Sequence, residues 1–211
     1  MADGSIVPAT RALRPDLQLI SDMIAPGSRV LDIGCGDGEL LAWLAHEKNV
    51  DGRGIEISRD GVRACVSHGL SVIQGDADTD LKDYPSQAFD YVVLSKTLQA
   101  TRNPREVLQE LARIGRFAAV SFVNYGHWRI RAGLLLSGRA PVTAGIGKSW
   151  YDSEDIHPCT LLDFVALCDE LGLTIEKAML VSPTGAGRSI GRVGRLVNLT
   201  GEQALFLLCQ G

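Results

Sequence analysis

The sequence lacks the features that mark membrane, secreted and zinc-binding proteins. No stretch of its 211 residues approaches the roughly 18 consecutive apolar residues of a membrane span, and residues 1–14 lack the apolar core of a secretory signal. Its five cysteines are an odd number without a C-x-x-C pair, and its four histidines show no metal-binding spacing. We therefore expect a cytoplasmic protein with no metal and no membrane contact.

The chain also has no excess of basic residues. The chain has 21 Lys and Arg residues against 25 Asp and Glu, a formal net charge of −4, whereas a nucleic-acid binder needs clustered cations to neutralise phosphates. Hydrophobic residues make up 45% and charged residues 22% of the chain, which is typical of a globular protein. We predict a single domain over residues 1–211 and no nucleic-acid partner.

The sequence does contain apolar strands that alternate with amphipathic helices. This alternation predicts an α/β fold with a mostly parallel sheet that is covered by helices on both faces. The Gly- and Arg-rich residues 185–195 predict a loop. The predicted strands are residues 29–33, 52–55, 71–73, 91–94, 117–122, 173–181 and 204–209, and the predicted helices are residues 16–24, 39–47, 60–67, 104–114 and 161–171.

Four segments follow one another within this domain. Residues 14–27 form an N-terminal helix, residues 28–123 a cofactor-binding core, and residues 160–211 a C-terminal helix and strand pair. Between them, residues 124–151 are rich in Gly, Arg and aromatic side chains. This insertion predicts either a lid, an amphipathic helix that docks on a partner protein, or an ordinary helix packed on its own sheet.

The most specific motif is D-I-G-C-G-D-G at residues 32–38, between a predicted strand and a predicted helix. Glycines there allow a tight turn and close approach of a ligand to the main chain. The third glycine of a dinucleotide fingerprint would fall at Glu39, so the motif departs from that fingerprint. Carboxylates at Asp32 and Asp37 would repel a pyrophosphate but would attract a ligand that carries a sulfonium and an ammonium group.

Two further acidic residues follow the next two predicted strands. Glu56 closes the second strand and can accept hydrogen bonds from both hydroxyls of a ribose. Asp76 follows the third strand and can accept a hydrogen bond from an adenine amino group, while the Ala77 N–H serves a ring nitrogen. Because open α/β sheets bind ligands at the carboxyl ends of their strands, these residues together predict an adenosine-type cofactor.

In their order, these motifs resemble those of class I S-adenosylmethionine-dependent methyltransferases. More narrowly, the chain resembles the MetW family of methionine biosynthesis proteins, because matching stretches also lie outside the cofactor motifs. These stretches are Leu13–Leu17, Asp32–Leu41, Phe89–Ser95, Thr97–Ala100, Asn124–Trp128 and Trp150–Asp152.

The resemblance implies a three-layer, doubly wound, Rossmann-like sheet of seven strands in which the last strand, residues 204–209, runs antiparallel. It implies S-adenosylmethionine or S-adenosylhomocysteine as the bound cofactor, with the glycines along the methionyl part, Glu56 on the ribose and Asp76 at the adenine. The residues that we expect to hold the cofactor are Asp32, Gly34, Cys35, Gly36, Gly38, Glu56, Ile57, Asp76, Ala77 and Ser95.

No single motif identifies the catalytic residues. The sulfonium is already a strong electrophile, so positioning alone can supply much of the catalysis. Ser95–Gln99 lacks the Asn/Asp-Pro-Pro-aromatic motif that holds a planar amine, which argues against methylation of DNA adenine or protein glutamine. The candidates are His127, which suits a general base, and Tyr125. The alternative for His127 is a hydrogen-bonded histidine packed under Trp128.

The resemblance leaves two functions open. Members of the family act beside homoserine O-acyltransferase. The resemblance therefore implies a bacterial protein that binds this enzyme and supports its activity. The acyl donor of the enzyme can be an acetyl or a succinyl group, and the sequence leaves both open. S-adenosylmethionine is the downstream product of methionine biosynthesis. Its binding would then couple the supply of the pathway to the demand for its product, provided that it favours one state of the complex. The alternative is a methyltransferase that acts on an unidentified small molecule.

Overall fold

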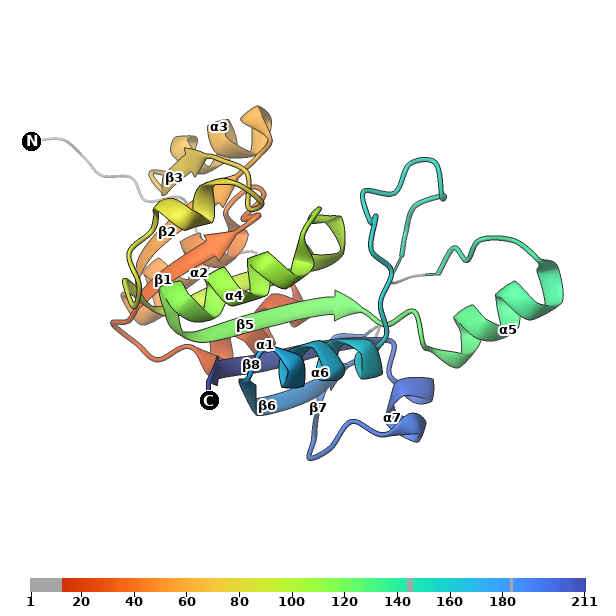
Figure 1. Cartoon of the computed structure of the whole chain (residues 1–211). Coiled ribbons are helices and arrows are strands. Elements are labelled where there is room, and N and C mark those ends of the chain that lie inside the picture. Colours follow the sequence, from red (N-terminus) through yellow and green to blue (C-terminus); the bar gives the residue numbers. More distant parts are fainter. Residues whose placement is uncertain (1–12, 144–145, 183) are drawn as a thin grey trace, which may run out of the picture.

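The computed structural model describes residues 13–143, 146–182 and 184–211, in which helices cover both faces of an eight-stranded sheet (Figure 1). Residues 1–12, where we find no secretory signal, lie outside the described part. The strands are β1 (Arg29–Ile33), β2 (Asp51–Glu56), β3 (Ser71–Gln74), β4 (Phe89–Ser95), β5 (Gly115–Val123), β6 (Leu173–Val181), β7 (Gly187–Ile190) and β8 (Gln203–Gln210). The helices are α1 (Pro15–Met23), α2 (Glu39–Lys48), α3 (Arg59–Ser67), α4 (Pro104–Ile114), α5 (Trp128–Ser137), α6 (Leu161–Glu170) and α7 (Arg195–Thr200), with 3₁₀ turns η1 (Asp80–Asp83) and η2 (Leu98–Ala100).

The strands are ordered β3-β2-β1-β4-β5-β8-β6-β7 across the sheet. Strands β1 to β5 pair in parallel, whereas β8 runs antiparallel to both β5 and β6. The predicted fold class, a mostly parallel sheet with an antiparallel last strand, is therefore confirmed. Because β1 to β4 are parallel, their carboxyl ends meet at one edge, where Asp32 lies opposite Gly54 of β2 and Val93 of β4.

The sheet has one strand more than the seven expected. Strand β7 lies within the stretch that predicted a loop, and α7 begins at the end of that stretch. β7 forms the edge of the sheet and pairs antiparallel with β6, from Gly187 opposite Val181 to Ile190 opposite Ala178. Its side chains are mostly exposed, so it needs only main-chain hydrogen bonds and carries no apolar alternation that would have predicted a strand.

The core is divided into two layers by the alternation of side chains along the strands. Leu31 of β1 joins a cluster under α4 and α6, where Phe122, Phe164 and Phe206 pack with ring centroids 4.7–5.9 Å apart. Val30, its neighbour on β1, faces the opposite cluster under α1 and α2. Burial on both faces explains why the central strands are mostly apolar.

The inserted segment, residues 124–151, departs from the sheet. Figure 1 shows α5 projecting away from the body, and Ile130 is the one buried residue of that helix. The interpretation of an ordinary helix packed on its own sheet is therefore wrong. Residues 144 and 145 of the segment lie outside the described part, and none of the described helices is long and apolar enough to cross a membrane.

Candidate functional site

A cavity of about 410 Å³ lies at the carboxyl end of β1, beside the glycine turn. Five of its ten lining residues were predicted from the sequence: Asp32, Gly34, Cys35, Gly36 and Ser95. The other five come from the segment before and within α1, from the glycine turn and from the start of α2: Arg14, Leu17, Asp37, Glu39 and Leu40.

The glycine turn has a backbone that only glycine adopts easily. Gly34, Gly36 and Gly38 have φ angles of 72°, 59° and 83°. The N–H groups of Gly34 and Cys35 both donate to the Ile55 carbonyl of β2, at 2.8 and 3.2 Å, which anchors the turn. A Cβ on Gly36 would have no heavy atom within 4 Å, so the main chain there is open to a ligand.

Glu56 holds this turn in place. Its Oε2 accepts a hydrogen bond of 2.8 Å from the Gly36 N–H, and its Oε1 accepts one of 2.8 Å from the Ser58 N–H. Since each carboxylate oxygen has two acceptor positions, Glu56 retains capacity for further donors, such as the ribose hydroxyls that the sequence predicted.

Asp32 is the most unusual group of the cavity. The residue is 4% exposed, and no hydrogen bond to its carboxylate is found within the described part of the chain. Burial and the negative charge of Glu56 raise its pKa from 3.8 to about 7, although the positive charge of Arg14 acts against them. A buried acid without a donor partner, lining a cavity, is suited to a ligand that brings a positive charge.

The start of α1 closes the cavity on its other side. The main-chain N–H and the guanidinium of Arg14 each contact the Glu39 carboxylate at 3.0 Å. Lys96, held at φ 56° after β4, pairs with Asp16 at 2.7 Å. The sequence reasoning missed Arg14 as a site residue, although it lies in one of the stretches that carried the family resemblance.

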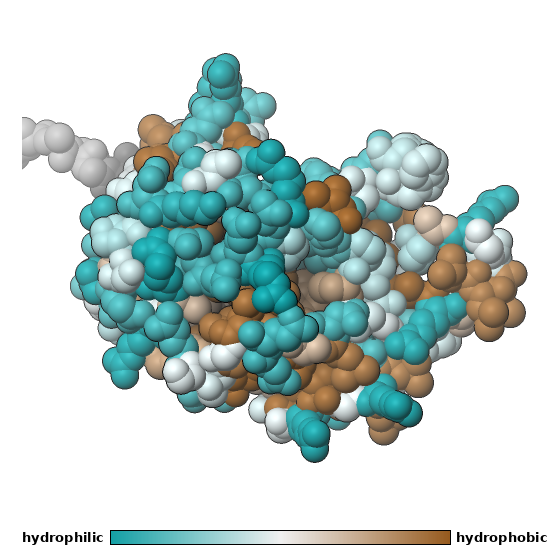
Figure 2. Space-filling view, viewed as in Figure 1, coloured by the Kyte–Doolittle hydropathy of each residue, from teal (hydrophilic) through white to brown (hydrophobic). Residues whose placement is uncertain are grey.

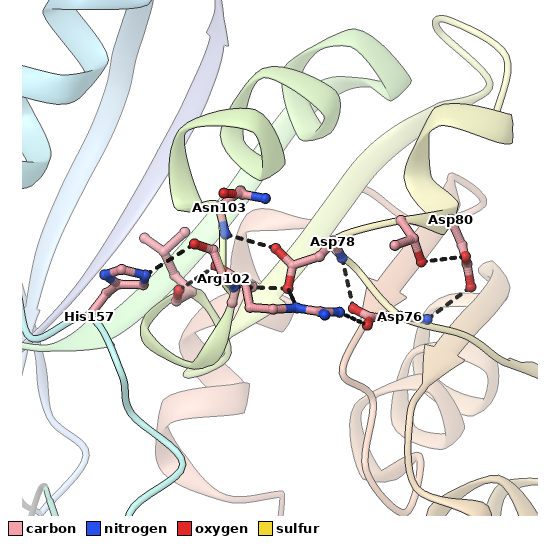
Figure 3. A network of polar contacts seen from close by, with 9 residues as sticks. Asp76, Asp78, Asp80, Arg102, Asn103 and His157 are labelled. Atoms are coloured by element: carbon pink, nitrogen blue, oxygen red, sulfur yellow. Dashed lines mark hydrogen bonds and ion pairs between the residues drawn. The ribbon is translucent and has the colours of Figure 1, made fainter.

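Asp76 is part of a polar network between the end of β3 and the start of α4 (Figure 3). Its carboxylate accepts from the Asp78 N–H at 2.9 Å and pairs with the guanidinium of Arg102. Asp78 in turn accepts from the N–H groups of Arg102 and Asn103, both at 2.9 Å. The sequence reasoning missed Arg102, because only the fold brings it to Asp76.

The remaining predicted residues lie beside the cavity rather than on its wall. Among the described residues we find no partner for the Ala77 N–H, which leaves it available to a ligand, and Ile57 is 65% exposed. Gly38 packs inward, since a Cβ there would come within 2.4 Å of Leu70 and 2.9 Å of Cys65. The structure thus places Asp76, Ala77 and Ile57 at the neighbouring strand ends and gives Gly38 a packing role.

Neither weak catalytic candidate lines the cavity. His127 caps the N-terminus of α5, where its Nδ1 accepts from the Arg129 N–H at 3.4 Å and its ring lies 5.9 Å from that of Trp128. Burial lowers the pKa of His127. The Tyr125 hydroxyl donates to Asp155 at 3.4 Å, and burial raises the pKa of Tyr125. Both side chains therefore have structural partners away from the cavity.

Asn124, at the end of β5, connects three segments that are distant in sequence. Its Nδ2 donates to the carbonyls of Asn198 and Gly201, both at 2.7 Å. Its Oδ1 accepts from the N–H groups of Gly126 at 2.9 Å and Leu161 at 3.2 Å. The residue is fully buried, so every polar atom of this amide is used to join β5, α6 and α7.

Comparison with known proteins decides the family. A family model described as "Methionine biosynthesis protein MetW" matches residues 14–208. The chain belongs to the MetW family. The bifunctional methionine biosynthesis protein MetXA/MetW of Rhodopirellula baltica is 32% identical over 180 residues, which are 81% of this chain and 29% of that protein. The chain thus covers less than a third of that relative.

Solved structures agree on the fold. A possible histamine N-methyltransferase from Thermotoga maritima, described as S-adenosylmethionine-dependent, is 18% identical with a TM-score of 0.67 over 95% of this chain and 90% of its own. The cyclase SpnF is 17% identical with a TM-score of 0.64 over 92% of this chain and 80% of its own. Since a protein described as a cyclase has this fold, the fold of this MetW family member does not by itself establish methyl transfer.

Proposed function

We propose that this MetW family protein binds S-adenosylmethionine and associates with homoserine O-acyltransferase, whose activity it supports. The observation that carries the proposal is the Rhodopirellula relative, in which a MetW region shares one chain with a MetXA region. We take the MetXA region as the counterpart of the acyltransferase. A covalent link keeps two domains at a high effective concentration. This arrangement in the relative supports an association between the MetW region of this protein and the acyltransferase.

The cavity fits the amino-acid end of S-adenosylmethionine. Asp32 would face its ammonium group, and the open main chain at Gly36 would lie along the methionyl part. Glu56, which already holds the turn, has acceptor positions left for the ribose hydroxyls. The Ala77 N–H and the Asp76 carboxylate would serve the adenine. The bound cofactor would supply a sulfonium-activated methyl group.

The partner role is favoured over methyl transfer because neither candidate catalytic side chain lines the cavity. The two catalytic candidates, His127 and Tyr125, are engaged in structural contacts elsewhere. A small-molecule methyltransferase remains the alternative, and it predicts that S-adenosylhomocysteine forms when the protein is mixed with its acceptor.

Arg14→Ala should weaken binding of S-adenosylmethionine about tenfold, because Arg14 lines the cavity and its guanidinium, which contacts Glu39, would also pair with the carboxylate of the ligand. Binding of 5′-methylthioadenosine, which lacks the amino-acid end, should be unchanged. Isothermal titration of both ligands measures the difference. Arg63→Ala on α3, where the side chain is 79% exposed, is the matched control. Equal losses for both ligands would contradict this role of Arg14.

Sedimentation velocity with the purified acyltransferase of the same organism tests the proposed function. We expect a complex that sediments faster than either protein alone. If the two proteins sediment independently at micromolar concentrations, with and without S-adenosylmethionine, the partnership is wrong. Turnover of S-adenosylmethionine with a cell metabolite extract would then be the next measurement.

A further inference from the structure

Helix α5 carries three consecutive leucines that the described part of the chain leaves exposed. Leu134, Leu135 and Leu136 are 54%, 85% and 84% exposed. Figure 1 shows the helix standing away from the sheet, and Figure 2 shows hydrophobic side chains gathered on this projecting part. Trp128 and Val142, which are also exposed, lie in the same segment, and we call residues 128–142 the arm. Contiguous exposed apolar surface of this kind marks interaction sites.

The positions of the leucines determine what can cover them. Successive residues of an α-helix are about 100° apart, so three consecutive leucines span about 200° of its circumference. A flat surface contacts only one side of a helix, whereas the two walls of a groove contact a helix on two sides and can cover so wide a span. The arm therefore fits an apolar groove on a partner better than it fits its own sheet.

The charge of the arm is opposite to that of the chain. Residues 124–151 contain no Asp or Glu, although the whole chain has a net charge of −4. The exposed Arg129, Arg131 and Arg139 all belong to the arm. Arg131 donates to the Gly126 carbonyl at 2.7 Å, and Arg129 lies over the Trp128 ring at 5.5 Å. A partner groove with acidic residues on its rim would complement this pattern.

Two other occupants fit these observations less well. In a symmetric dimer the same patch meets itself, so paired arms would bring arginines against arginines. A helix that lies on a lipid surface needs a single apolar face opposite a polar one, whereas the three leucines occupy more than half of the circumference. A distinct protein partner satisfies both the shape and the charge of the arm.

We propose that the arm, residues 128–142, is the element that docks on the acyltransferase, in an apolar groove with an acidic rim. This inference rests on the proposed function, since it names the surface used in that partnership.

Leu135→Ser/Leu136→Ser tests the proposal in titrations with the acyltransferase. We expect its dissociation constant to rise about 30-fold or more, as for truncation of central interface side chains. Val66→Ser on α3, where the side chain is 58% exposed, is the matched control and should bind as the wild type does. Arg139→Glu should slow association and reduce its dependence on salt, whereas Arg116→Glu, at the opposite end of β5, should not.

The outcomes separate this proposal from the proposed function. If the wild-type protein binds the acyltransferase and the leucine variant binds equally well, the arm is not the docking element while the partnership stands. If the wild type itself does not bind, both fail. Loss of S-adenosylmethionine binding in the leucine variant with unchanged partner binding would instead identify the arm as a lid. Arm-dependent self-association, or arm-dependent binding to vesicles of phosphatidylcholine and phosphatidylserine with no effect on the partner, would also overturn the proposal.

Discussion

Asp32→Asn should reduce the affinity for S-adenosylmethionine at least about 100-fold and, at the same time, stabilise the ligand-free protein. The loss of affinity follows from removal of the buried negative charge that would face the ammonium group inside the cavity, where breaking a buried charge pair costs about 3–5 kcal/mol. Isothermal titration measures it. Asp60→Asn, on a side chain that is 91% exposed, is the matched control.

The gain in stability follows from the pKa of Asp32. This pKa is about 7 in the folded chain against a reference value of 3.8. The folded state therefore binds more protons between about pH 4 and pH 7, and its stability falls as the pH rises through this range. Above pH 7 the full difference amounts to about 4 kcal/mol. The variant still buries a polar amide, so we expect Asp32→Asn to recover about half of this free energy of unfolding. This gain corresponds to a rise in Tm of about 4–8 °C at pH 8.

The same carboxyl group makes cofactor binding depend on pH. An ammonium beside Asp32 would lower its pKa, so binding releases a proton below about pH 7 and the affinity weakens up to about tenfold for each further unit of acidification. Titrations in two buffers of different ionisation enthalpy would count the protons released. If Asp32→Asn binds as tightly as the wild type, or if no proton is released at pH 6, the assignment of Asp32 to the ammonium group is wrong.

Asn124→Ala should destabilise the fold by about 3–5 kcal/mol, which corresponds to a fall in Tm of about 6–20 °C. The change leaves two buried carbonyls and a buried N–H without their partner, and it loosens the junction of β5, α6 and α7. Leu161 would keep a second acceptor, Asn198 Oδ1 at 3.0 Å. Thermal and urea unfolding followed by circular dichroism measure the effect.

Asn103→Ala provides the control for this variant, because Asn103 is exposed and its side chain makes no capping hydrogen bond. We expect its Tm to stay within about 2 °C of the wild type. A similar small shift for Asn124→Ala would mean that the amide network contributes little. The N-Y-G-H-W stretch would then need another explanation than the joining of these three segments.

The central sheet could be predicted from the sequence because its strands are buried on both faces. The mostly apolar runs Arg29–Ile33 and Tyr91–Leu94 place β1 and β4 correctly. Strand β7 could not be predicted, since an exposed edge strand shows no apolar pattern. The sequence also left three interpretations of the segment that contains the arm: a lid, a docking helix or a helix packed on its own sheet. Three adjacent leucines define no single face, so their periodicity does not show what a helix packs against.

The candidate site was predictable where one local motif builds it and unpredictable where the fold assembles it. The glycine turn and Asp32 share one short stretch, and both line the cavity. Arg14 reaches the cavity from the segment before α1, and Arg102 reaches Asp76 from a loop 26 residues away. Neither position has a local signal. The pKa of Asp32 likewise depends on burial and on Glu56, which only the structure brings close.

The rate of homoserine O-acyltransferase with and without this protein tests the central claim most directly. The assay uses the purified enzyme of the same organism, saturating homoserine and acyl donor, and increasing amounts of the protein. We expect a saturable rise in rate. An unchanged rate at every protein concentration, with and without S-adenosylmethionine, would contradict the partner role and leave the small-molecule methyltransferase as the better explanation of the cofactor cavity.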